Sequence, residues 1–146
     1  MADAANWPLT AFHFEVEWAG TKISAQEVTG LNFTTETIDY RAGDDQTFIK
    51  QKVPGLKSFE NISIKKGMFK DDLDFYEWFT DVQANPERRE TITIQLLDET
   101  HAPVMVWTVE NAYPIKLSGP TLNGENNALA IETLELAHEG ITLETA

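Results

Sequence analysis

Residues 41–70 read RAGDDQTFIKQKVPGLKSFENISIKKGMFK, a positively charged stretch within an acidic protein. The stretch holds seven lysines and arginines against three carboxylates, a balance of +4. Because the chain of 146 residues has a formal net charge of −13 at pH 7, the residues outside the stretch carry −17. Opposite charges on two parts of one small protein suit self-association, in which the basic segment of one copy meets the acidic surface of another. Charge alone slightly favours the alternative, an ordinary solvated surface.

The same stretch predicts two extended segments with a break between them. Residues 47–53 form the first, and residues 58–66 alternate like a half-buried strand that ends at Gly67. Pro54 fixes φ and removes a hydrogen-bond donor, while Gly55 accepts a positive φ. We therefore expect strand pairing to stop at these two residues.

Three strands are predicted before this stretch. Apolar and polar side chains alternate in residues 11–18, as is typical of a half-buried strand. Residues 22–29 are expected to pair back on it as a hairpin, and residues 31–40 form a third strand that leads into a polar turn. The apolar face of the first strand is expected to hold Phe12, Phe14, Val16 and Trp18, with His13, Glu15 and Glu17 opposite.

One helix is predicted, over residues 72–84. Asp71 lies at the N-cap position, and the pair Asn85-Pro86 provides a stop. Its apolar side chains recur at the spacing of one helical face, so the helix must pack against a sheet or a neighbour. They are Phe75, Trp78, Phe79 and Val82.

The C-terminal third predicts a hairpin and one ambiguous run. Residues 91–97 and 104–110 read as two strands joined by a tight polar turn, with Trp107 packing inward. Residues 129–143 alternate like a buried strand, yet they also fit helical spacing, and their alanines, glutamates and leucines favour a helix. The residues alone leave this run open.

Several segments of the sequence resemble those of the tail-tube protein family. They are YRAGDD at residues 40–45, the Pro-Gly-Leu-Lys of residues 54–57, ISIKKGMF at 62–69, PLTAFHFEV at 8–16 and ETLELAHEG at 132–140. This family comprises the inner tubes of contractile phage tails and of phage-derived extracellular injection particles, including the Photorhabdus virulence cassette and antifeeding prophage types. The likeness runs along nearly the whole chain.

The resemblance implies a mainly β fold of the tail-tube/Hcp-like kind, a β-sandwich or small barrel with one flanking helix. It implies that residues 1–146 are a single domain, and that residues 129–143 form a terminal strand. It further implies hexameric rings, joined edge strand to edge strand, that stack into a hollow tube. The expected partners are other copies of the chain, a contractile sheath protein, baseplate and cap proteins, and cargo in the lumen.

We assign three sets of candidate contact residues on this basis. The basic stretch is expected to reach the next ring or a neighbour, through Arg41, Asp44, Asp45, Lys50, Lys52, Pro54, Gly55 and Lys57. Glu15 and Glu17 are expected either to line an acidic lumen or to form the outer surface that a basic sheath helix grips. Trp7, next to a proline before the first strand, is a candidate anchor at an interface.

Catalytic and metal-binding signatures are absent from the sequence. The chain has no cysteine, no P-loop, no nucleophile elbow and no HExxH motif. The three histidines have no spacing that indicates a shared metal, and we expect no cofactor. Asp71, Asp72 and Asp74 lack the glycine and distal glutamate of a calcium loop. A final acidic group is interpreted as a solvated face rather than a catalytic pair: Glu132, Glu135 and Glu139.

Other function classes remain as alternatives. Within the family, the tube of a contractile-tailed phage would conduct DNA instead of an effector. Outside it, a monomeric acidic β-sandwich could bind a basic partner protein, and a hydrolase would need a convergent polar pocket. The first residues lack the apolar run of a secretory signal, and no stretch is long and apolar enough to span a bilayer. We expect synthesis in the cytoplasm, no membrane insertion, and a final place in an extracellular particle.

Overall fold

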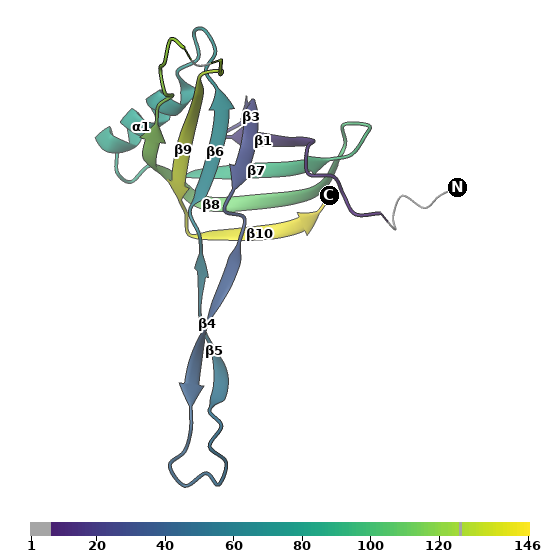
Figure 1. The fold of residues 1–146 in the computed structure, drawn as a ribbon, viewed down its shortest axis with the longest axis vertical. Coiled ribbons are helices and arrows are strands. Elements are labelled where there is room, and N and C mark those ends of the chain that lie inside the picture. Colours follow the sequence, from purple (N-terminus) through teal and green to yellow (C-terminus); the bar gives the residue numbers. More distant parts are fainter. Residues whose placement is uncertain (1–6, 126) are drawn as a thin grey trace.

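The computed structural model describes residues 7–125 and 127–146, and its body is two antiparallel sheets that share one long strand, β8 (Pro103–Ser118). The first sheet contains β2 (Thr21–Ile23), β1 (Phe14–Trp18), β7 (Glu90–Leu97), the first part of β8, and β10 (Gly140–Thr145). The second contains the last part of β8, β9 (Ile131–Ala137), β6 (Ile62–Gly67) and β3 (Ala25–Thr29). Figure 1 shows that the strands of the two sheets cross.

The core lies between the two sheets and is almost entirely apolar. It takes alternate residues of both sheets, such as Val16 and Ile92 from the first and Ile64 and Leu134 from the second, all fully buried. Alternation of this kind is what places one face of each strand in the core. The predicted mainly β fold with one flanking helix is confirmed.

A two-stranded ribbon projects away from this body (Figure 1). Its strands are β4 (Phe33–Tyr40) and β5 (Gln51–Phe59), which pair only with each other, and we call residues 33–59 the arm. The expected break at Pro54 and Gly55 is wrong, because β5 runs through both and Pro54 lies opposite Thr37. Both strands of a two-stranded ribbon have an open edge, which is where a proline is tolerated.

Strand boundaries differ from the prediction at three further places. Residues 58–66 are not one strand, since β5 ends at Phe59 and β6 begins at Ile62. Residues 22–29 give only half of the expected hairpin, because β2 pairs with β1 whereas β3 pairs with β6. The ambiguous run 129–143 is β-structure, divided between β9 and β10.

Helix α1 (Asp74–Ala84) covers one side of the two sheets. Asp71 is not its N-cap: the backbone φ of Asp71 is +64°, and the N-cap position belongs to Leu73, which makes no side-chain cap bond. Phe75 and Trp78 are fully buried, and the Trp78 ring stacks on Trp18 with centroids 4.2 Å apart. No helix in residues 7–125 and 127–146 has the length and apolar content to cross a bilayer.

The first strand is shorter than expected at its start. Phe14, Val16 and Trp18 face the core as predicted, but Phe12 lies before β1 and is 83% exposed. Trp107 packs partly buried against the core, in agreement with its predicted inward position.

Candidate functional site: the arm, its joint and the sheet edges

The arm continues the β3–β6 pair beyond a joint at Gly30 and Asn61. Gly30 has φ +95°, a conformation that L side chains rarely adopt. A Cβ atom there would overlap the carbonyl oxygen of Asn61 and lie 3.0 Å from the Cα of Ile62. Only glycine therefore lets the two backbones approach this closely where the arm leaves the body.

Side chains around the joint tie the base of the arm to the body. Asn32 Nδ2 donates to Glu60 Oε2 at 2.7 Å, and His138 Nε2 donates to the Glu60 carbonyl oxygen at 2.8 Å. The Phe33 and Phe59 rings meet edge to face, with centroids 5.9 Å apart. These contacts hold the arm in one direction relative to the sheets.

The arm exposes an unusual amount of apolar surface. Phe48 and Ile49 at its tip are 90% and 75% exposed, and Leu56 is 78% exposed. An isolated two-stranded hairpin is marginally stable in water, so an exposed apolar ribbon of this kind needs a covering surface from another molecule. Other large apolar side chains on the arm are also open to solvent: Phe33, Ile38, Tyr40 and Val53.

The charge of the arm differs from that of residues 41–70. Lys65 and Lys66, counted as basic in the sequence, lie in β6 and form ion pairs within the body. The arm itself holds four cations and four carboxylates, so it is electrically neutral. The cations Lys50, Lys52 and Lys57 lie on or next to β5, whereas β4 carries carboxylates. The arm is thus polarised from one strand to the other rather than uniformly basic.

Two of the predicted contact residues shape the tip loop instead of projecting from it. Arg41 donates to the carbonyl oxygens of Asp45 (2.9 Å) and Thr47 (3.1 Å), and its guanidinium lies 5.3 Å from the centre of the Phe48 ring. Asp45 accepts the backbone N–H of Thr47 at 3.1 Å. Lys50, Lys52 and Lys57 are exposed and form no ion pair among the described residues.

The second sheet has open edges on both sides. Its outer strands are β3 and the last part of β8, residues 113–118, and its four strands alternate in direction. Each outer strand has unpaired N–H and C=O groups along one side, which can pair with a strand of another molecule. Glu15 and Glu17 lie elsewhere, on the outer face of the first sheet, where Glu15 forms a 3.0 Å ion pair with Lys22.

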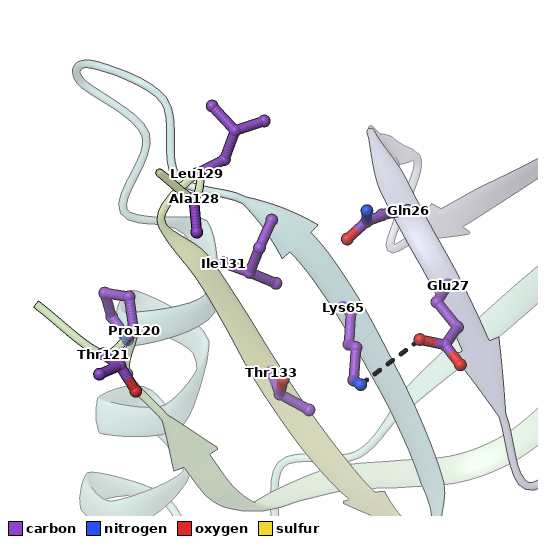
Figure 2. Close-up of a pocket in the computed structure, with 10 residues that line it drawn as sticks. Gln26, Glu27, Lys65, Pro120, Thr121, Ala128, Leu129, Ile131 and Thr133 are labelled. Atoms are coloured by element: carbon purple, nitrogen blue, oxygen red, sulfur yellow. Dashed lines mark ion pairs between the residues drawn. The ribbon is translucent and has the colours of Figure 1, made fainter. Parts of the chain in front are cut away.

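A shallow hollow of about 620 Å³ lies on the outer face of the second sheet (Figure 2). Lys65 and Glu27 point toward one another across it and form a 3.4 Å ion pair, with Thr133 and Ile131 on the neighbouring strand. This ion pair compensates the charge of the lysine in the hollow. Among the described residues, no group of three or more histidines and carboxylates is arranged to hold a metal.

The sequence that forms this two-sheet body and its arm matches a known family. The model of the family described as T4-like virus tail tube protein gp19 matches residues 10–142. The chain belongs to this family. No curated protein matched the sequence.

Solved structures agree with this assignment. The chain is similar to a chain of the extended sheath-tube complex of an extracellular contractile injection system, PVC, at 28% identity and a TM-score of 0.90, covering 98% of this chain and 95% of that one. It is similar to a chain of the anti-feeding prophage cap at 28% identity and a TM-score of 0.88, with both chains fully covered. Hcp1 from Flavobacterium johnsoniae, at 15% identity, a TM-score of 0.56 and coverage of 92% and 97%, shares the fold. This tail tube protein is a structural tube subunit of a contractile injection system.

One grouping in the tail tube protein, a pair of histidines, had no signal in the sequence. His13 and His101, 88 residues apart, meet with Nε2 and Nδ1 2.9 Å from one another, and His13 Nδ1 donates to the Asp98 carbonyl oxygen at 3.0 Å. They join the segment before β1 to the turn between β7 and β8. Trp7, the predicted anchor, is 71% exposed and borders a hollow beside the same turn.

The solvated acidic face predicted near the C-terminus is wrong for Glu132. This side chain is buried between the sheets, where it pairs with the buried Lys66 at 2.5 Å, and Lys66 also contacts Asp72 at 3.1 Å. The inward position of Glu132 follows from the alternation of β9, whose buried residues are 132, 134 and 136. Glu135 and Glu139 do lie on the surface, where they accept hydrogen bonds from the side chains of Asn61 and Asn111, respectively.

Proposed function

We propose that residues 1–146 act as one domain that assembles into hexameric rings through the edges of the second sheet. Because its four strands alternate in direction, the two outer strands, β3 and residues 113–118 of β8, run antiparallel to each other. Placing β3 of one copy beside β8 of the next continues the antiparallel pairing around a ring. Closure in this way removes the open edges, which would otherwise invite uncontrolled aggregation.

The rings stack through the arm, and this single feature carries the proposal. A neutral ribbon with exposed Phe48, Ile49 and Leu56 is directed away from its own body, so its covering surface comes from another ring. Contact from one ring to the next is head to tail and does not close on itself, which permits a tube of open length. Lys50, Lys52 and Lys57 contribute electrostatic contacts there, together with the turn at Asp44 and the backbone at Pro54 and Gly55.

The two faces of the ring then have different roles. Since the second sheet is the one that closes into the ring, its outer face lines the lumen, and the hollow of Figure 2 with its Lys65–Glu27 pair faces the cargo. Glu15 and Glu17, on the outer face of the first sheet, face the sheath. Similar chains come from structures described as a sheath-tube complex, a tube terminating cap and a baseplate, which supports those partners. Trp7 serves as a further contact anchor.

The particle and its location follow from the same resemblance. We favour effector cargo over phage DNA, because the chains at 28% identity belong to extracellular injection systems and the anti-feeding prophage. The subunit is made in the cytoplasm and reaches the exterior as part of the particle, without insertion of this chain into a membrane. Assembly requires no covalent chemistry and no cofactor.

Purified protein is expected to form rings of six subunits that convert to tubes as concentration rises. Negative-stain microscopy and light scattering measure both species directly. The alternative, a monomeric acidic binding module, predicts one 16.4 kDa species at all concentrations. A monomer that persists at high concentration would therefore overturn the proposal.

Reversing charge on the arm is expected to shorten tubes without unfolding the subunit. The double variant Lys50→Glu/Lys52→Glu places two carboxylates beside an acidic partner, so tube length should fall at least tenfold while circular dichroism stays unchanged. The matched control Lys22→Glu/Lys70→Glu makes the same change in net charge at exposed positions off the arm. Equal tube lengths for the two double variants would show that the arm lysines take no part in the stacking contact.

A further inference from the structure

The two sheets leave an apolar groove at the side opposite α1. Figure 1 shows α1 and β3 on opposite sides of the body, and the groove lies along β3. Its volume is about 290 Å³, which exceeds the roughly 150 Å³ of a dry protein cavity that binds benzene. The apolar side chains that define it come from the segment before β1 and from both sheets: Leu9, Phe14, Val28, Leu31, Leu96 and Trp107.

The rim of this groove is acidic where it adjoins a second hollow. Asp98 and Glu99 line that hollow, which shares Leu9 with the groove, whereas Glu27 lines the groove itself and is paired with Lys65. Hydrogen bonds from the Ala102 backbone N–H and from Thr100 hold the pKa of the Asp98 carboxyl below its usual value. No lysine or arginine is among the described residues that line either hollow.

The arm tip has the complementary chemistry. Phe48 and Ile49 are its two most exposed apolar side chains, Lys50 and Lys52 follow them, and residues 46–53 contain no carboxylate. We propose that Phe48 and Ile49 of a second copy insert into this groove, with Lys50 and Lys52 against its acidic rim. The inference rests on the proposed tube assembly and names the surface that receives the arm.

The tip of the same copy is excluded as the occupant. The eight residues of β4 span roughly 27 Å at about 3.4 Å each, and the joint directs them away from the body. Burial in the groove removes from water two large apolar side chains that the free subunit exposes. Each such side chain is expected to contribute favourably to stacking in proportion to the apolar area covered.

Site-directed cross-linking tests the placement, because the chain has no cysteine of its own. The double variant Leu9→Cys/Ile49→Cys, assembled into tubes and treated with a short bismaleimide, should give a covalent ladder of oligomers on a denaturing gel. The control Leu122→Cys/Ile49→Cys carries its first cysteine on an 85% exposed loop residue outside the groove lining, and its yield should be at least tenfold lower. A third variant, Leu9→Cys/Tyr76→Cys, tests the alternative that α1 of a neighbouring copy occupies the groove, because Tyr76 lies exposed on α1.

The outcomes separate this inference from the proposed function. Tubes with a ladder only in the Leu9/Ile49 pair support the placement. Tubes in which the control or the Leu9/Tyr76 pair cross-links as well or better overturn the placement and leave the tube function standing. Wild-type protein that never forms rings or tubes overturns both.

Discussion

Gly30→Ala is expected to destabilise the subunit and to abolish tube assembly. The substitution places a methyl group onto the carbonyl oxygen of Asn61 while the backbone stays at φ +95°. The left-handed conformation costs an L residue about 1–2 kcal/mol, and forcing an extra methyl into a packed site costs about 1–3 kcal/mol more. We expect the free energy of unfolding to fall by about 2–5 kcal/mol, or the arm to change direction to relieve the overlap.

Gly20→Ala is the matched control for this effect. Gly20 also has a positive φ, +82°, but a Cβ atom there meets nothing within 4 Å. Its substitution should therefore cost only the conformational part, about 1–2 kcal/mol, and leave tubes intact. Urea unfolding of both variants measures the free energies, and electron microscopy scores the tubes. Equal losses in the two variants, or normal tubes from Gly30→Ala, would show that the close approach at the joint does not position the arm.

Local sequence patterns predicted the elements that are set by neighbours along the chain. The alternation of Phe14, Val16 and Trp18, the tight hairpin around residue 100 and the apolar stripe with Phe75 and Trp78 all occur where expected. In each case the period of the side chains follows directly from strand or helix geometry. These elements need no knowledge of distant residues.

The errors came from strand pairing and from the loop before the helix. Pro54 indicates a break only if a strand must pair on both sides, and the structure gives it an open edge. Asp71 looked like an N-cap, whereas the loop before α1 is positioned by Asp72, which contacts Lys66 and accepts the Asp74 backbone N–H at 3.1 Å. Pairing partners and register are set by tertiary structure, so no local pattern could show the open edge at Pro54.

The candidate site, too, could be predicted from the sequence only in part. Residues of the arm are identified from the sequence as a contact surface, but Lys65 and Lys66 are counted there as part of the same basic surface. Ion pairs with Glu27 and with Glu132 remove both lysines from that surface. No local pattern could show the role of Gly30, because that role depends on the backbone of Asn61, 31 residues later.

The contacts of Lys66 make it a structural charge over the whole neutral range. Burial lowers its pKa, but the hydrogen bonds that Lys66 donates to Glu132 and Asp72 outweigh that effect and raise the pKa above 10.5. Its contribution to stability is therefore full below that pH and is lost as pH rises through the raised value. Burial raises the pKa of Asp72, but hydrogen bonds from the Asp74 backbone and Lys66 take it below 3.8, so its contribution is full above that pH and is lost on further acidification.

Lys66→Met is accordingly expected to lower the free energy of unfolding by about 3–5 kcal/mol at pH 7, because it leaves the Glu132 carboxylate buried without its partner. The neighbouring Lys65→Met removes a half-exposed pair with Glu27 and should cost less than about 1 kcal/mol. Adding Glu132→Leu to Lys66→Met should recover most of the loss, since two apolar side chains can replace a buried ion pair. Urea titration of the three variants decides: a double variant as unstable as the single one would mean that Lys66 acts through Asp72 and the start of α1, and not by neutralising Glu132.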